Sequence, residues 1–375
     1  MLHVRTSGLV LAIAAAVAPF AAACSSPAPE PASTMSAAAS VATPAAPANE
    51  PTLRFVQSNG IRMRVAEMGK GPLVILLHGF PESWYSWRHQ LPALAKAGYH
   101  VVAPDLRGYG KSDKPAAVED YDIHKLTADI VGLIDAFGEK TAILIGHDWG
   151  AAIAWNSLLL HPERYTALVA MSVPYSGRPK SSPTATLKKA QGDNFYYTLY
   201  FQEPGVAEKE LDADPRGFLS RLYLSPDSPR EPPAITDRKR VAGGWIPRMG
   251  APKGLPEWLT QKDLDYYVAE FTESGFRGGI NFYRNSERNW ETTPQLAGAK
   301  ITVPVRFIAG ARDGVIRRGG EGTAEELTQR MSRVVTDLRG VVLIPEAGHW
   351  VQQEKPQETN AAIIEFLKGL PSNER

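Results

Sequence analysis

The sequence predicts an α/β protein with a mostly parallel central sheet and a helical insertion between two parts of that sheet. Short apolar runs alternate with segments of helical periodicity over residues 53–174, which is the pattern of strand–helix–strand units. The alternation stops over residues 175–298, which are rich in Tyr, Trp, Pro and Gly, and it resumes over residues 299–375. We therefore expect a core in two parts, 53–174 and 299–375, and a helical cap over 175–298 that covers the strand ends.

The first part of the core follows from apolar runs, turn signals and helical spacing. A Ser58-Asn59-Gly60 turn predicts a hairpin, and the continuous apolar run 73–77 predicts a strand buried on both faces. The predicted elements, in order, are strands 53–56, 61–65 and 73–77, a helix 84–97, a strand 100–103, a helix 123–137, a strand ending at Ile145, a helix ending at Leu160 and a strand 168–172.

The same signals predict the rest of the chain. The clearest helix of the cap covers 264–271. The second part of the core should contain a strand 303–309, a helix 324–332, a strand 341–344 and a terminal helix 356–368. This last helix begins at Pro356 and is followed by Gly369, the usual placement of these residues at helix ends.

Residues 1–23 have the features of an export signal: a short polar start, an apolar run from Gly8 to Phe20 and three alanines. The apolar run is too short for an ordinary membrane-spanning helix. Cys24 follows directly and resembles a bacterial lipoprotein processing site, although it could be incidental to plain signal cleavage. Residues 24–52 are almost all Ala, Pro, Ser and Thr and predict a disordered tether. We expect a protein of the bacterial cell envelope, lipid-anchored through Cys24, or otherwise periplasmic or secreted.

Composition excludes several classes of protein. The net charge is +1, so bulk electrostatics give no reason to expect nucleic acid as a partner. Cys24 is the only cysteine, which rules out an intrachain disulfide and a cysteine-rich metal site. The eight histidines show no H-x-x-x-H spacing, which disfavours a zinc hydrolase. The sequence does not determine the oligomeric state.

Three side chains predict a catalytic triad. Gly146-x-Asp148-x-Gly150 has the spacing of a nucleophile elbow with aspartate in place of serine, although Asp148 could instead cap a helix. Asp313 and His349 each follow a predicted strand. Each of them alone could be an ordinary loop residue. Together they give the chain order nucleophile, acid, histidine that is found in α/β-hydrolases, so we expect the α/β-hydrolase fold.

A carboxylate nucleophile restricts the chemistry. It can displace a leaving group from a saturated carbon and form an alkyl ester, which water must then hydrolyse. His349 oriented by Asp313 would activate that water, and the backbone N–H groups of Phe80 and Trp149 could stabilise the resulting oxyanion. No metal or organic cofactor is needed. A halide and an epoxide oxygen both remain possible leaving groups, and only the epoxide oxygen needs an acid such as a tyrosine phenol.

Six motifs of this chain closely resemble soluble epoxide hydrolases of the α/β-hydrolase superfamily, from about residue 53 to the end. They are HGFPESWYSW (78–87), GHDWG (146–150), FQEPGVA (201–207), SGFRG (274–278), NFYRNSERNW (281–290) and GHW (348–350). The resemblance implies that Asp148 is the nucleophile, His349 the base and Asp313 its orienting acid. It also implies that Tyr197 and Tyr283 donate to the epoxide oxygen, and that Phe80 and Trp149 form the oxyanion hole.

Together with the predicted export signal and the aromatic residues near the predicted site, the resemblance predicts an exported, single-domain epoxide hydrolase that acts on a small apolar epoxide and water. Tyr196 and Tyr200 compete with Tyr197 for its role. Two rival functions remain: a haloalkane dehalogenase that uses the same Asp148 ester, and a non-catalytic ligand-binding protein of the envelope. The chain departs from the family at Gly314, where a bulkier residue is common, and in the Pro-rich cap segment 224–233.

Overall fold

The structure is a computed structural model that describes residues 50–317 and 320–371. The predicted signal segment 1–23, Cys24 and the tether as far as residue 49 lie outside the described residues. All residues of these described ranges belong to one compact unit. Within the described ranges, no helix combines the length and the apolar character that a membrane crossing requires.

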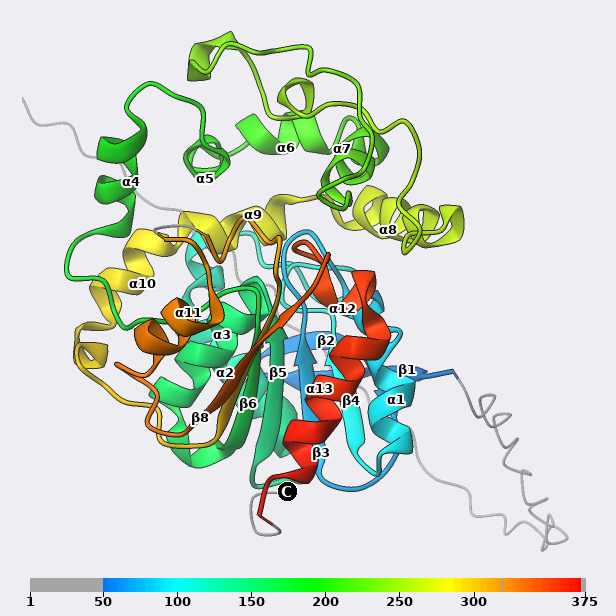
Figure 1. Cartoon of the computed structure of the whole chain (residues 1–375), viewed down its shortest axis with the longest axis vertical. Coiled ribbons are helices and arrows are strands. Elements are labelled where there is room, and N and C mark those ends of the chain that lie inside the picture. The colour runs from blue at the N-terminus through cyan, green and yellow to red at the C-terminus, as the bar shows by residue number, and fades with distance from the viewer. Residues whose placement is uncertain (1–49, 318–319, 372–375) are drawn as a thin grey trace, which may run out of the picture. The chain divides into compact units, whose positions relative to one another are not determined.

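An eight-stranded sheet forms the centre of the molecule (Figure 1). Its strand order is β1-β2-β4-β3-β5-β6-β7-β8; β1–β2 and β2–β4 pair antiparallel, and the other neighbours pair parallel. The sheet therefore has the mostly parallel order that the sequence predicts. The strands are β1 (Thr52–Ser58), β2 (Ile61–Met68), β3 (Leu73–Leu77), β4 (His100–Pro104), β5 (Ala142–His147), β6 (Tyr165–Met171), β7 (Val305–Gly310) and β8 (Leu338–Ile344).

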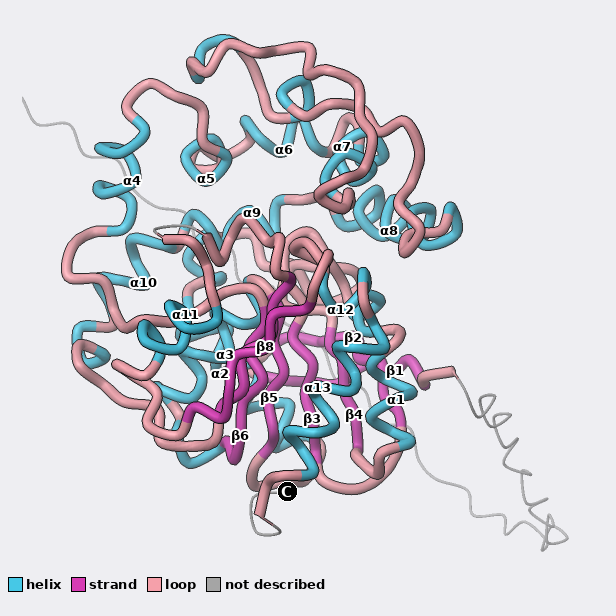
Figure 2. Tube along the Cα trace, viewed as in Figure 1, coloured by secondary structure: helices cyan, strands magenta, loops and turns pink. Residues whose placement is uncertain are grey.

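Helices cover both faces of this sheet, which explains why β3 and β5 read as continuous apolar runs (Figure 2). One apolar cluster joins one face to α2 (Ile123–Ala136), α3 (Trp149–Leu160) and α11 (Ala324–Met331). A second cluster joins the other face to α1 (Gln90–Lys96) and α13 (Pro356–Lys368). The central strands are therefore buried between two layers of helices, and the loops at their carboxyl ends start from this packed core.

The segment between β6 and β7 contributes helices that lie over the carboxyl ends of the strands (Figure 1). The predicted helix 264–271 is present and is longer than predicted, because it begins at Gln261 and ends at Ser274. The helices of this segment are α4 (Pro183–Gln191), α5 (Tyr197–Tyr200), α6 (Val206–Leu211), α7 (Pro215–Leu222), α8 (Gln261–Ser274), α9 (Arg277–Arg284) and α10 (Ser286–Thr292).

Two elements differ from the prediction. The expected helix 84–97 is split into a 3₁₀ turn, Trp84–Trp87, and α1 (Gln90–Lys96). Pro92 has no N–H to donate to the preceding turn, so the helix has to restart with Pro92 in its first turn. The short helix α12 (Val351–Glu354) was not predicted, because four residues are too few to show a helical period.

Candidate active site

The turn between β5 and α3 holds Asp148 in a strained conformation, with φ 52° and ψ −117°. The turn depends on its glycines: a Cβ on Gly150 would lie 1.9 Å from the Leu77 carbonyl oxygen, and one on Gly146 would lie 2.4 Å from that of Gly150. Asp148 occupies the N-cap position of α3, but its side chain makes no capping hydrogen bond. The turn thus points the carboxylate away from the helix.

The structure brings the three predicted triad residues together from the ends of β5, β7 and β8. His349 Nδ1 lies 2.9 Å from Asp313 Oδ2, and His349 Nε2 lies 3.6 Å from Asp148 Oδ2. Asp313 is buried, and its other oxygen accepts the N–H of Val315 at 2.7 Å. The imidazole therefore stands between a fixed acid and the carboxylate of the elbow.

These carboxylates control the ionisation of the imidazole. Burial lowers the pKa of His349, but Asp313 and Asp148 outweigh burial, and the pKa lies well above its usual value. Burial raises the pKa values of both carboxyl groups, yet the interactions with His349 keep each pKa below its ordinary value. Asp148 is thus ionised at neutral pH, as a nucleophile must be.

Backbone donors surround one oxygen of Asp148. The N–H of Phe80 donates to Asp148 Oδ1 at 3.0 Å. Trp149 is the first residue of α3, so its N–H has no acceptor within that helix. The loop that carries Phe80 can lie this close to Asp148 because Gly79 has no side chain: a Cβ on Gly79 would lie 2.4 Å from the Cβ of Asp148. Both predicted oxyanion donors are therefore next to the elbow, and Phe80 is already bonded to it.

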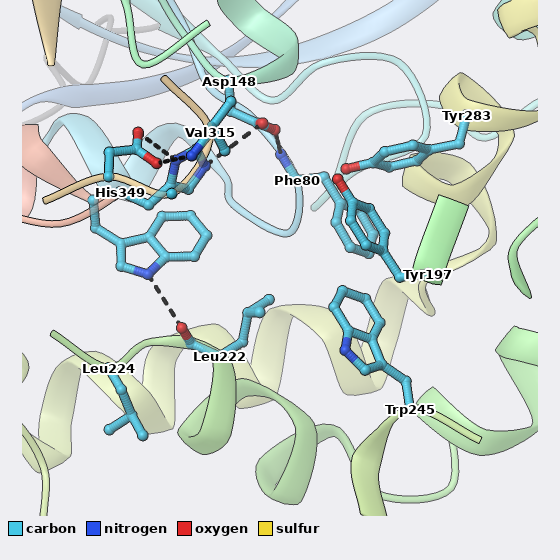
Figure 3. A pocket seen from close by; sticks show the side chains of 12 residues that line it. Phe80, Asp148, Tyr197, Leu222, Leu224, Trp245, Tyr283, Val315 and His349 are labelled. Atoms are coloured by element: carbon cyan, nitrogen blue, oxygen red, sulfur yellow. Dashed lines mark hydrogen bonds and ion pairs between the residues drawn. The ribbon is translucent and has the colours of Figure 1, made fainter. Parts of the chain in front are cut away.

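A cavity of about 380 Å³ opens in front of Asp148 (Figure 3). The rings of Tyr197 and Tyr283 lie 5.7 Å apart, and Figure 3 shows both hydroxyl groups pointing toward the side of the cavity where the Asp148 carboxylate lies. Burial raises the pKa of Tyr283 well above its usual value, and the charge of Asp148 adds to this rise. A phenol in this position stays protonated. The lining residues are Phe80, Asp148, Tyr197, Leu222, Leu224, Trp245, Tyr283, Asp313, Gly314, Val315, His349 and Trp350.

The two competing tyrosines lie elsewhere. Tyr200 donates its hydroxyl to Glu210 Oε2 at 2.8 Å, and Tyr196 stacks on Tyr197 with ring centroids 5.2 Å apart. Neither of them lines the cavity. Tyr197, on the first turn of α5, is the member of this tyrosine cluster that reaches the cavity.

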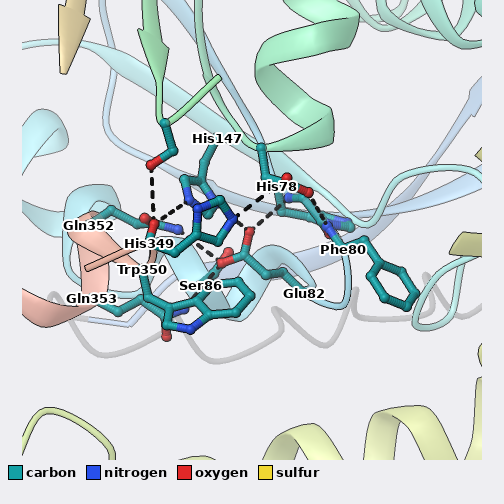
Figure 4. A network of polar contacts seen from close by, with 12 residues as sticks. His78, Phe80, Glu82, Ser86, His147, His349, Trp350, Gln352 and Gln353 are labelled. Carbon is teal, nitrogen blue, oxygen red and sulfur yellow. Dashed lines mark hydrogen bonds and ion pairs between the residues drawn. The ribbon is translucent and has the colours of Figure 1, made fainter. Parts of the chain in front are cut away.

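A buried carboxylate behind the site was not predicted (Figure 4). Glu82 Oε2 accepts the Gly79 N–H at 2.8 Å and contacts His147 Nδ1 at 2.7 Å, while Oε1 accepts the side-chain amides of Gln352 and Gln353. His147 Nε2 in turn lies 2.8 Å from the carbonyl oxygen of His349. Glu82 thus connects three parts of the site: the loop that carries Phe80, the turn that carries Asp148 and the segment that carries His349. No local sequence pattern marks Glu82 for this role, because its partners lie 65 and 270 residues away along the chain.

The cavity walls contributed by the cap were also missed. Leu222, Leu224 and Trp245 come from the end of α7 and from the irregular segment that follows it. Tertiary contacts place these side chains, and the sequence around them has no periodic pattern that would predict their positions. Gly314, noted as a departure, lines the cavity, and a Cβ there would have no atom within 4 Å.

Comparison with known proteins shows which family has this sequence and fold. The α/β hydrolase fold family matches residues 72–356. The chain is 51% identical over 324 residues to epoxide hydrolase A of Mycobacterium tuberculosis, covering 85% of this chain and 98% of that protein. It is 42% identical to epoxide hydrolase 3 of Siraitia grosvenorii, covering 83% and 96%. The crystal structure of epoxide hydrolase A from Mycobacterium thermoresistibile superposes with a TM-score of 0.79 at 50% identity, covering 86% of this chain and 99% of that chain.

Proposed function

We propose a catalytic mechanism for this chain, which belongs to the α/β hydrolase family and, as an epoxide hydrolase within it, converts epoxides to vicinal diols. In the first step Asp148 Oδ2 attacks one carbon of the epoxide. The C–O bond of the ring breaks, an ester bond forms, and a phenol of Tyr197 or Tyr283 gives its proton to the leaving oxygen. Two phenols suit this step because they are donors that remain protonated at neutral pH.

The second step hydrolyses the ester. His349 takes a proton from a water molecule, which attacks the Cγ atom of Asp148. Oδ1 becomes the oxyanion, because it already accepts the Phe80 N–H at 3.0 Å, and the N–H of Trp149 would be its second donor. The tetrahedral intermediate collapses, and the diol oxygen leaves with the proton that His349 took from the water. The second proton of the water returns to the tyrosine phenolate, so that the Asp148 carboxylate and the phenol are both restored. Asp313 holds the ring and stabilises the imidazolium.

One observation carries the choice of an epoxide over a halide. Tyr197 and Tyr283 reach the cavity from two different cap helices and face Asp148 across it (Figure 3). A departing halide needs only weak N–H donors, whereas an epoxide oxygen leaves as an alkoxide and needs acidic ones. The aromatic and aliphatic walls favour an apolar substrate.

Trapping of the ester tests this mechanism. In the variant His349→Gln the first step should proceed while the second stops, so incubation with styrene oxide should add the full mass of the epoxide to Asp148. Intact-mass and peptide mass spectrometry would detect and place the adduct. A matched incubation with a haloalkane should leave the mass unchanged. An alkyl adduct from the haloalkane alone would favour a dehalogenase, and the absence of both adducts and of wild-type turnover would contradict an enzymatic role.

We also propose that the chain is exported and anchored to a membrane through acylated Cys24. The composition of residues 1–24 is the support for this proposal. Expression in a bacterium with a radioactive fatty acid should label the wild-type protein and leave Cys24→Ser unlabelled. Equal labelling of both proteins, or labelling of neither while both are exported, would contradict acylation at this residue.

A further inference from the structure

Trp245 lies in a segment with little regular structure, yet its ring is closely packed. Between α7, which ends at Leu222, and α8, which begins at Gln261, the described chain forms two 3₁₀ turns and isolated β-bridges. The Trp245 ring nevertheless stacks on Tyr197 with centroids 4.8 Å apart and planes 14° apart, and it contacts Phe201 and Phe218 edge-on at 5.5 and 5.2 Å. Figure 3 shows Trp245 beside Tyr197 at the wall of the cavity.

The carboxylate of Glu210, on α6, holds this segment in place. Glu210 Oε2 accepts the Trp245 N–H at 2.8 Å, and Oε1 accepts the Ile246 N–H at 3.0 Å. The Glu210 carboxylate can lie this close to the backbone only because residue 244 is glycine: a Cβ on Gly244 would lie 2.2 Å from Glu210 Oε1. Hydrogen bonds to a charged acceptor are stronger than neutral ones, so this pair fixes the backbone that carries the indole.

The same carboxylate also holds the helix of Tyr197. The hydroxyl of Tyr200 donates to Glu210 Oε2 at 2.8 Å. Tyr200 is the last residue of α5 and Tyr197 is the first, and a helix of four residues has little stability of its own. One carboxylate therefore connects the helix that bears Tyr197 with the ring that packs against Tyr197.

We propose that Glu210 is a positioning residue that fixes Tyr197 from two sides, through Trp245 and through Tyr200, and so sets the geometry of ring opening. This inference rests on the proposed role of Tyr197 as a donor to the epoxide oxygen. Glu210 touches neither the substrate nor the reacting atoms. It acts on the first step alone, because ester hydrolysis uses Asp148, His349 and Asp313 on the other side of the cavity. Trp245 also lines the cavity, so its ring would contribute to an aromatic wall for an aryl-substituted epoxide.

Single-turnover kinetics separate this role from a general contribution to folding. Wild type, Glu210→Gln and Glu210→Ala would be mixed in excess with styrene oxide, quenched with acid and weighed intact. Glu210→Ala should form the ester about 10- to 100-fold more slowly, the range expected when a catalytic group is misplaced by about 1 Å. Hydrolysis of the preformed ester should stay within about twofold of wild type, because its residues are unchanged. Glu210→Gln keeps one oxygen acceptor, so its rate of ester formation should lie between those of wild type and Glu210→Ala.

A matched control and a double variant complete the test. Glu203 is exposed in the same cap region, so Glu203→Gln should leave both steps unchanged. If Glu210 acts largely through the indole, Glu210→Ala in a Trp245→Ala background should slow ester formation much less than it does in the wild type. Equal slowing of both steps, or normal ester formation in a folded Glu210→Ala, would overturn the inference. If the wild type forms no ester, the proposed function fails instead, so the two failures are distinguishable.

Discussion

At the scale of single residues, the nucleophile regulates its own base. The charge of Asp148 is one of the causes that keep the pKa of His349 well above its usual value. Ester formation removes that charge, so the pKa of His349 should fall in the intermediate, while Asp313 still holds the ring at 2.9 Å. The imidazole is thus more basic before the first step than during the second, where it must be neutral to accept a proton from water.

A pH series should separate the two steps. Ester formation requires ionised Asp148, whose pKa is held below its ordinary value, so this step should persist into mildly acidic solution. Hydrolysis requires neutral His349 and should slow as the pH falls through the pKa of His349 in the intermediate. The fraction of enzyme trapped as ester during turnover should therefore rise as the pH is lowered, as measured by rapid acid quench and intact-mass spectrometry. A trapped fraction that rises with increasing pH would contradict this order of ionisations.

At the scale of elements, two glycines let α9 approach the core. A Cβ on Gly278 would lie 2.1 Å from the carbonyl oxygen of Gly108, and one on Gly279 would lie 2.7 Å from the Phe80 ring. The same helix carries Tyr283, which follows Gly278 by five residues and Gly279 by four. The distance between the Tyr283 phenol and the elbow is therefore set by a backbone contact that no larger residue permits.

Gly278→Ala should displace α9 and Tyr283 with it. The added methyl meets backbone atoms, which cannot rotate away, so we expect a loss of about 1–3 kcal/mol in the free energy of unfolding. Ester formation should also slow more than ester hydrolysis. Gly254→Ala is the matched control, because a Cβ there has no neighbour within 4 Å. Denaturant unfolding and single-turnover kinetics would measure both effects, and equal results for the two variants would show that the glycine contact is unimportant.

The elements that could be predicted are those whose sequence carries a local signal. Every predicted core strand lies within, or within two residues of, an observed strand, because apolar runs and turn residues mark it. Asp148, Asp313 and His349 could be found because each follows such a strand. Trp245 and Glu210 could not, since their positions depend on contacts 35 residues apart within an irregular segment. Local patterns therefore locate the reacting groups, and only tertiary structure shows what holds them in place.

At the scale of the whole molecule, a buried cation joins the cap to the core. Arg64 on β2 contacts Asp105 Oδ2 at 2.5 Å, and it contacts Glu270 on α8 of the cap at 2.5 and 3.1 Å. Asp105 is fully buried and also accepts the Trp84 N–H at 3.0 Å. Charges this deep need partners, so the contact both neutralises Asp105 and fixes the end of α8 on the sheet.

Arg64→Leu should destabilise the molecule by about 3–5 kcal/mol, because it leaves the Asp105 carboxylate buried without its cation. Arg216→Leu offers a matched comparison: it removes an arginine of the cap whose partner Asp265, also on α8, is half exposed at 52%. Solvent screens such an exposed pair, which therefore contributes little to stability, so this variant should unfold close to wild type. Denaturant unfolding of the two variants measures the difference. If both lose the same free energy, burial of Arg64 is not what makes the contact important. If Arg64→Leu loses more free energy of unfolding than Arg216→Leu and also binds styrene oxide less tightly, the buried cation holds the cap in the position that the cavity requires.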